Sequence, residues 1–274
     1  MLAVLLVALS GYSQDTTLLD LTFDNPSNPD TVGNLPLGLG AAMSPGTTEG
    51  NNRIVVIDSL ANKAGTGLGV EIVDDDTRSG TRMEYEISPS QSAIRWDFSF
   101  SPGRVDGPGA SYFNAAVTGP GMSTGSSASR FAGVRLYENG TVRFQAGAAP
   151  GAIGAYIPVV KGGLYRVSFF VNDKAEPIAY TDPNGVAGNL LPADSVDYWM
   201  DAADGNGIVY IGGGQIQGGG AAGSISEGTN GLGRVGFGST SGAIGLNYIV
   251  DDIKITKIVP PAGPGTLSLY LLGE

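Results

Sequence analysis

The sequence predicts an all-β, antiparallel β-sandwich, and three observations carry this prediction. Glycine supplies 44 of the 274 residues, and glycine is costly inside helices because it has so much backbone freedom to lose. Charged residues make up only 15% of the chain, well below the usual share of roughly a quarter. No helix-period segment of convincing length occurs, whereas apolar and polar residues alternate repeatedly, as they do in half-buried strands. Many short strands joined by turns, without intervening helices, indicate a sandwich.

The strands are expected where this alternation recurs. It is clearest over residues 93–100, where four large apolar side chains alternate with polar ones and predict one buried face and one outer face. In chain order, the ranges with strand character are 18–23, 53–57, 68–73, 82–87, 93–100, 111–117, 131–137, 141–145, 155–160, 164–172, 178–180, 208–211, 234–238 and 247–258.

Turn residues connect several of these ranges. Asn139-Gly140 lies between two expected strands, and Asn-Gly is the strongest short hairpin signal. Asp-Pro-Asn-Gly at 182–185 is typical of a β-turn. The glycine-rich stretch 212–223 is expected to be a loop, and it matches no phosphate-binding pattern.

The chain divides into three expected parts. The apolar run at its start is followed by the small residues Gly11 and Ser13, which predicts a signal peptide over 1–13, although no positive charge precedes the run. One β-sandwich domain is expected over 18–258, because no linker long enough to separate two domains occurs. A Pro/Gly-rich segment over 259–274 ends in a short apolar stretch.

Composition excludes several function classes. A net charge of −11 with scattered Lys and Arg argues against nucleic acid as a partner, because neutralising phosphates requires clustered basic residues. The chain has no cysteine and no histidine. It therefore has no thiol chemistry and lacks the commonest general base and metal ligand.

Three segments resemble the concanavalin A-like lectin/glucanase and laminin-G-like jelly rolls. Residues 19–24 (LDLTFD) are similar to the first strand of that fold. Residues 134–144 followed by 163–171 resemble its hairpin and the strand after it, and 235–239 with 248–255 resemble its close. The resemblance implies a jelly roll in which the last strand pairs near the first.

The tail is similar to the start of a bacterial PEP-CTERM sorting signal, which implies a bacterial surface protein. Its apolar part would cover only residues 267–272, and no basic cluster follows. The alternative is a Pro/Gly linker with an apolar end. Contact with a membrane is expected only through such a C-terminal sorting anchor.

Related jelly rolls often hold a structural calcium between the first and last strands. By that resemblance the ligands to test here are Asp24 and Asp251, with Asp252 as a substitute. Carboxylate and carbonyl oxygens are the ligands that calcium prefers. No other cofactor is expected.

Glu84 and Glu86 are the candidates for acid–base catalysis. Residues two apart on a strand leave from the same face at roughly 6–7 Å, a separation compatible with glycosidase chemistry. Two carboxylates on one strand, however, do not easily reach opposite faces of a sugar ring. The acidic sequence pattern of the related glucanases is also absent. The alternative is a solvated sheet face.

Sugar recognition would use aromatic faces that stack on pyranose rings. The candidates are Tyr112, Tyr198, Trp199 and Tyr210, expected at strand ends or in loops. Each of them has packing as its alternative role.

The sequence thus favours an exported, non-catalytic module that binds carbohydrate, with an extracellular glycan or envelope component as its partner. Two alternatives stay open. One is a polysaccharide-active enzyme, either a glycoside hydrolase or a lyase, that uses carboxylates. The other is a structural or adhesive surface protein.

Overall fold

The computed structural model describes residues 15–21, 23, 41–42, 53–75, 80–125, 130–147, 152–201, 207–216, 231–239 and 245–259. The expected signal peptide at 1–13, the expected calcium ligand Asp24 and residues 260–274 of the expected tail lie outside the described residues. Within the described ranges, no helix is long and apolar enough to cross a membrane.

The described strands follow one another without helices between them. They are β1 (Thr16–Leu21), β2 (Ala41–Ala42), β3 (Arg53–Ile57), β4 (Gly69–Asp74), β5 (Arg82–Gln91), β6 (Ala93–Pro102), β7 (Tyr112–Thr118), β8 (Arg130–Tyr137), β9 (Thr141–Ala146), β10 (Ala152–Pro158), β11 (Tyr165–Asn172), β12 (Ile178–Tyr180), β13 (Asn189–Leu191), β14 (Ser195–Asp201), β15 (Ile208–Gln215), β16 (Leu232–Gly238) and β17 (Leu246–Lys257).

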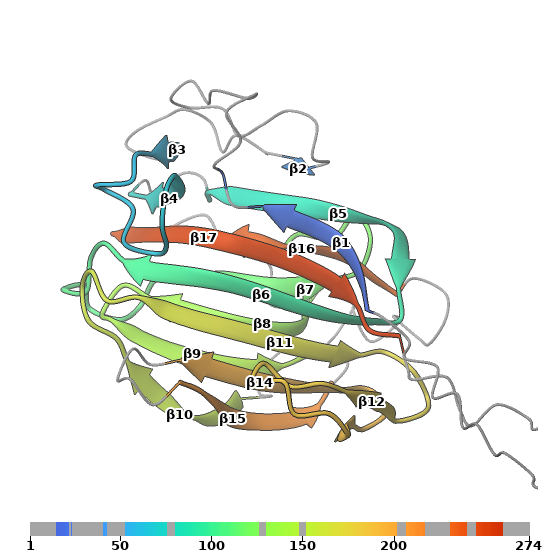
Figure 1. The fold of residues 1–274 in the computed structure, drawn as a ribbon. Coiled ribbons are helices and arrows are strands. Elements are labelled where there is room, and N and C mark those ends of the chain that lie inside the picture. The colour runs from blue at the N-terminus through green and yellow to red at the C-terminus, as the bar shows by residue number, and fades with distance from the viewer. Residues whose placement is uncertain are drawn as a thin grey trace, which may run out of the picture.

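These strands form two antiparallel sheets that lie face to face (Figure 1). The larger sheet has the order β15-β14-β11-β6-β17-β4-β3, with β1 paired to β17. The smaller sheet has the order β10-β9-β8-β7-β16-β5-β2, and β12 and β13 form a separate hairpin. The predicted antiparallel jelly-roll sandwich is confirmed, and the first and last described strands are neighbours, as the resemblance implied.

The core lies between the two sheets, and alternation decides which side chains enter it. On β6 the predicted apolar face is confirmed, since Ile94, Trp96, Phe98 and Phe100 are all buried. Trp96 packs edge-on against Phe169 of β11, with ring centroids 5.1 Å apart, and it makes a similar contact with a phenylalanine of the smaller sheet. Burial of these large rings supplies much of the hydrophobic stabilisation that holds the sheets together.

Two buried tyrosines also link the sheets by hydrogen bonds. Tyr198 of β14 donates its hydroxyl hydrogen to the carbonyl of Gln145, 2.5 Å away, and accepts from the backbone N–H of Gly133 at 2.8 Å. Tyr248 of β17 donates to the carbonyl of Tyr137 at 2.5 Å. Each hydroxyl satisfies backbone groups of the smaller sheet from a strand of the larger one.

The predicted turns at 138–140 and 182–185 are confirmed. The N–H of Gly140 donates to the carbonyl of Tyr137 at 3.1 Å between β8 and β9, and Gly140 has a φ of 72°. Likewise, the N–H of Gly185 donates to the carbonyl of Asp182 at 3.0 Å, and Gly185 has a φ of 83°. Both glycines take up the left-handed conformation that favours glycine.

Some local predictions were wrong. The short strands β2 and β13 were not expected. Residues 195–201 were also not expected to be a strand but form β14, which pairs with β11 and β15 along its length. The stretch 212–223 was expected to be a loop from its first residue, yet β15 continues through residues 212–215. The glycines of β15 pair with β14, where they allow a close approach of neighbouring side chains.

The outer face of the larger sheet is covered over part of its area. The β12–β13 hairpin brings Ile178, Tyr180 and Leu191 onto it, where they form a second apolar cluster with Phe170 and Trp199. The ring of Tyr180 lies 4.2 Å from that of Phe170. The polar part of the same face, beside this cluster, stays open.

Candidate functional site

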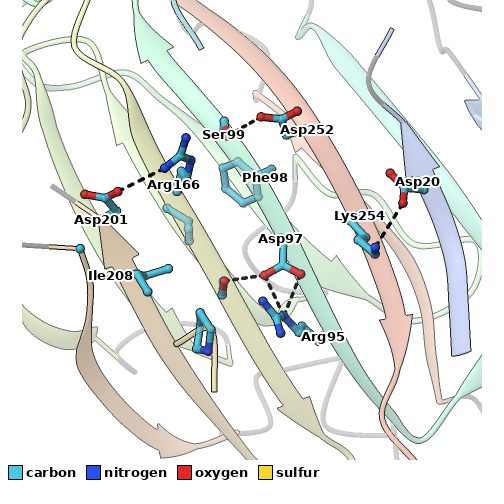
Figure 2. Close-up of a pocket in the computed structure, with 14 residues that line it drawn as sticks. Asp20, Arg95, Asp97, Phe98, Ser99, Arg166, Asp201, Ile208, Asp252 and Lys254 are labelled. Atoms are coloured by element: carbon cyan, nitrogen blue, oxygen red, sulfur yellow. Dashed lines mark hydrogen bonds and ion pairs between the residues drawn. The ribbon is translucent and has the colours of Figure 1, made fainter. Parts of the chain in front are cut away.

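A pocket of about 500 Å³ lies on this open part of the outer face. Alternation places it there: Arg95, Asp97 and Ser99 of β6 do not enter the core and point to the outside. Neighbouring strands contribute more polar side chains at the same level, as Figure 2 shows. The polar residues that line the pocket are Asp20, Arg95, Asp97, Ser99, Arg166, Ser168, Asp201, Asp252 and Lys254.

Asp97 is at the centre of the pocket's hydrogen bonds. The Nε of Arg95 lies 2.9 Å from one of its carboxylate oxygens and 2.8 Å from the other. The hydroxyl of Ser168, directly opposite on β11, donates to the same carboxylate. These contacts hold Asp97 in one orientation, so its position does not depend on a ligand.

Further polar pairs flank this centre (Figure 2). Arg166 lies 3.6 Å from Asp201, and Lys254 lies 3.2 Å from Asp20. The hydroxyl of Ser99 donates to Asp252 at 3.2 Å. The Arg166 side chain is 59% exposed, and exposed ion pairs of this kind contribute only about 0–1 kcal/mol. Arg166 and Lys254 can therefore exchange these partners for those of a ligand at little cost.

The next row of the same face is aromatic. Trp199 and Tyr210 are paired across β14 and β15, one row from the pair formed by Asp201 and Ile208 in the pocket. Their ring centroids are 5.3 Å apart. Trp199 is only 9% exposed, whereas Tyr210 is 51% exposed. Of these two rings, the face of Tyr210 is the one that solvent and a ligand can reach.

Asp197 lies beneath these rings and accepts two tyrosine hydroxyls. Tyr180 donates to it at 2.8 Å and Tyr210 at 3.0 Å. Burial raises the pKa of the Asp197 carboxyl, and the two hydrogen bonds only partly offset that effect. Burial also raises the pKa of Tyr210, to about 12, with the nearby charge of Asp197 as the second cause.

The other predicted sugar-binding tyrosines are placed elsewhere. Tyr198 lies in the core with 0% of its surface exposed, and its hydroxyl is used between the sheets. Tyr112 is on the outer face of the smaller sheet, under the guanidinium of Arg135. The predicted set is thus divided between two faces and the core, and only Trp199 and Tyr210 lie near the pocket.

Glu84 and Glu86 lie together on β5, on the outer face of the smaller sheet, and Arg234 bridges them. Arg234 Nη1 is 3.1 Å from Glu84 and its Nε is 2.6 Å from Glu86. Glu84, only 4% exposed, also accepts from the N–H and the hydroxyl of Thr124 at 2.8 and 2.6 Å. Glu86 accepts from the N–H of Gly121 at 3.0 Å. These bonds tie the loop at 119–125 to the sheet and occupy the carboxylate oxygens.

The residues expected to bind calcium are partly described. Asp251 is fully buried and accepts from the side-chain amide of Asn62 at 2.8 Å and from the N–H of Asp252 at 2.7 Å. Asp252 lines the pocket at a bulge of β17, with a φ of 50°. Within the described part of the chain, no three His, Cys, Asp or Glu side chains gather as a metal site would need. Calcium at Asp24, Asp251 and Asp252 stays a prediction.

The residues at the centre of the pocket were not among the sequence candidates. Arg95, Asp97, Arg166 and Ser168 are polar members of strongly alternating strands, and that signal is visible in the sequence. It indicates an outer face without indicating which strands will be neighbours on it. The pairing of β6 with β11 and β17 decides that these groups meet.

No protein-family model matches the chain, and no curated protein sequence matches it significantly. Solved structures do match the chain. The chain is similar to the carbohydrate esterase vb_24B_21 from the Shiga toxin-encoding bacteriophage phi24B, with a TM-score of 0.53 and 14% identity over 90% of this chain and 100% of that one. It is also similar to the protein of unknown function SO2946 from Shewanella oneidensis MR-1, with a TM-score of 0.52 and 14% identity over 92% and 91% of the two chains.

A GH131 β-glucanase catalytic domain from Podospora anserina is more distant, with a TM-score of 0.45 and 10% identity over 88% of this chain and 98% of that one. Identities this low establish a shared fold and no shared activity. The first two similarities agree with the antiparallel sandwich described above.

Proposed function

We propose that this chain is an exported, non-catalytic module that binds an extracellular glycan in the pocket of the larger sheet. The observation that carries the proposal is the alternation of donors and acceptors around Asp97, beside the exposed ring of Tyr210. Sugar hydroxyls both donate and accept hydrogen bonds, so a surface of paired carboxylates and cations matches them. A ring face next to such groups suits the apolar face of a pyranose.

The pocket also has the right size and rigidity for this role. Its volume lies within the range of roughly 300–1,000 Å³ that small-molecule sites occupy. Ser168 and Arg95 hold Asp97 in place, so binding does not have to order that side chain. The exposed Arg166 can turn from Asp201 towards a ligand, since such pairs contribute little to stability.

A non-catalytic role is supported by the state of the two glutamates. A general acid or base needs an oxygen within reach of the substrate, but Arg234, Thr124 and the Gly121 N–H engage those of Glu84 and Glu86. One similar structure is named a carbohydrate esterase, so catalysis remains the alternative that an assay must address.

The test is a glycan array followed by calorimetry with matched variants. Arg166→Gln removes a pocket cation, and Arg104→Gln removes the cation of another exposed Arg–Asp pair, which does not line the pocket. Losing one charge-assisted hydrogen bond should weaken binding at least about tenfold. We expect that loss for Arg166→Gln and wild-type affinity for Arg104→Gln. Equal affinities for the two variants would refute the pocket as the site.

A reducing-sugar assay on the same glycans separates the alternatives. Binding without turnover supports the proposal, and turnover that Glu84→Gln abolishes would establish an enzyme instead. If no glycan binds and an envelope component is captured, the adhesive alternative is favoured. Export is tested by sequencing the N-terminus of the secreted protein, which should begin at Gln14.

A further inference from the structure

The outer face of the smaller sheet carries three arginines on neighbouring strands. Arg130 and Arg135 belong to β8, and Arg143 belongs to β9. Arg135 and Arg143 are directly opposite each other in the ladder, a position in which like charges destabilise a sheet. Among the described residues, none of the three forms an ion pair with a carboxylate, whereas Arg234 on the same sheet pairs with two. In a chain of net charge −11, this is an unusual local excess of positive charge.

Arg130 is the most buried of the three, with 2% of its surface exposed. Its Nη1 donates to the side chain of Asn114 at 2.6 Å and its Nε to the carbonyl of Gly147 at 3.1 Å. Its Nη2 has no hydrogen-bond partner within the described structure. Burial, and secondly the charge of Arg135, lower the pKa of Arg130 to about 10. It is still charged at neutral pH, and an uncompensated buried charge is strongly unfavourable.

Tyrosine rings hold the other two guanidinium groups in place without neutralising them. Arg135 lies 4.3 Å from the ring centre of Tyr112, and Arg143 lies 4.8 Å from that of Tyr156. Tyr137 stands between these rings, with centroid distances of 5.1 and 5.6 Å. The Nε atoms of both arginines are buried and have no hydrogen-bond partner among the described residues. Arg135 Nη1 also donates to the hydroxyl of Tyr137 at 3.5 Å, and Arg143 Nη1 to that of Tyr156 at 3.0 Å. The tyrosines therefore fix the direction of the cations, and the Nε donors stay unused.

Small residues beside Arg130 make room for its side chain. Gly133 lies between the levels of Arg130 and Arg135 on β8, and a Cβ there would come within 2.4 Å of the Arg130 side chain. Its neighbours in the same row are Ala116 and Gln145. The side-chain oxygen of Gln145 is also buried and has no partner in the described part of the chain. The row beside Arg130 therefore holds an unsatisfied acceptor next to an unsatisfied donor.

We infer that this face binds an anionic sugar, with the carboxylate or sulfate of an acidic polysaccharide placed among Arg130, Arg135 and Arg143. Guanidinium groups bind such oxyanions through paired N–H donors. An anion there would offset the electrostatic repulsion between Arg135 and Arg143. The exposed side of Tyr156, half of whose surface is accessible, offers a ring to the sugar. The anion site is independent of the pocket on the other sheet; only its assignment to a glycan rests on the proposed function.

The experiment compares oligogalacturonate, its methyl ester and a sulfated galactose oligomer by calorimetry at low and high salt. We expect an anionic oligomer to bind at least about tenfold tighter than the methyl ester, and the preference to fall with salt. The better of the two anionic oligomers identifies carboxylate or sulfate. Arg135→Gln and the more peripheral Arg143→Gln should each abolish the preference. Arg104→Gln, which removes an exposed arginine outside both sites, should keep it.

Equal affinity for the acid and its ester, or a preference that survives both Arg135→Gln and Arg143→Gln, would overturn the inference. If a neutral glycan binds and only Arg166→Gln weakens it, the proposed function stands and the anion site fails. A thermal-shift series with free galacturonate and galactose covers the case in which no oligomer binds. Stabilisation by the acid alone, lost in both variants, would support an anion site while the proposed function fails; no shift would overturn both.

Discussion

The hydroxyl of Tyr198 offers the sharpest test of how the two sheets are held together. Tyr198→Phe keeps the buried ring and removes only the oxygen that accepts from Gly133 and donates to Gln145. Both partners are backbone groups in a dry interior, and leaving a buried polar group unsatisfied costs about 1–3 kcal/mol. For two groups we expect the free energy of unfolding to fall by about 3 kcal/mol, which lowers the Tm of a domain this size by about 6–12 °C.

Calorimetry and urea unfolding measure this loss, with two tyrosines as references. Tyr248→Phe removes one buried bond, to the carbonyl of Tyr137, and should cost about 1 kcal/mol. Tyr210→Phe should cost less, because Tyr210 is half exposed and Asp197 keeps its bond from Tyr180. A Tyr198→Phe variant within about 0.5 kcal/mol of wild type would refute the reasoning. If that variant instead lost glycan binding at unchanged stability, Tyr198 would contact the ligand after all.

Three more predictions concern the sheet, the buried carboxyl and calcium. Gly236→Ala should lower the free energy of unfolding by about 3 kcal/mol or more in urea unfolding, because its Cβ would lie 2.2 Å from the carbonyl oxygen of Met83. Gly214→Ala is the control and should cost less, because its Cβ would lie 3.3 Å from the end of the Ile153 side chain. Equal losses of stability in the two variants would contradict this prediction. Burial raises the pKa of Asp197 above its usual value, so the folded state binds this proton more tightly than the unfolded state does. The free energy of unfolding of the wild type therefore decreases as pH rises through that raised pKa. The stability of Asp197→Asn relative to wild type should therefore increase with pH in urea titrations, and a pH-independent difference would count against it. If calcium binds at Asp24, Asp251 and Asp252, EDTA should lower the Tm, and an unchanged transition would remove the site.

The sequence allowed most strands to be predicted from side chains of alternating polarity, but β14 was missed and glycine hides part of β15. Residues 212–215 of β15 are read as a loop because glycine has no side chain to alternate. Their reason for being glycine is spatial: a Cβ on Gly213 would come within 2.0 Å of Asp197, which accepts the hydroxyl of Tyr210. Such a constraint comes from a neighbouring strand and leaves no periodic trace in the sequence.

The candidate site was predictable only in part, for a related reason. Alternation indicates that Arg95 and Asp97 face outwards, but their meeting with Ser168 and Lys254 depends on ladder register between strands about 70 and 155 residues away. The aromatic candidates were selected by residue type, but the structure buries some of them and exposes others. Tyr198 and Tyr210 belong to adjacent strands, yet one points into the core and the other out of it.

The two outer faces compensate their charges in opposite ways, and this contrast carries a functional consequence. In the pocket, Arg95, Arg166 and Lys254 each have a carboxylate partner, so a neutral ligand can enter without leaving a charge uncompensated. On the smaller sheet, Arg135 and Arg143 lie opposite each other and pack against tyrosine rings, so an anionic ligand would supply the negative charge that they lack. The chain's net charge of −11 averages over both faces and conceals this difference. Salt should therefore weaken binding at the second face far more than at the first, because only there does the ligand itself contribute the opposite charge.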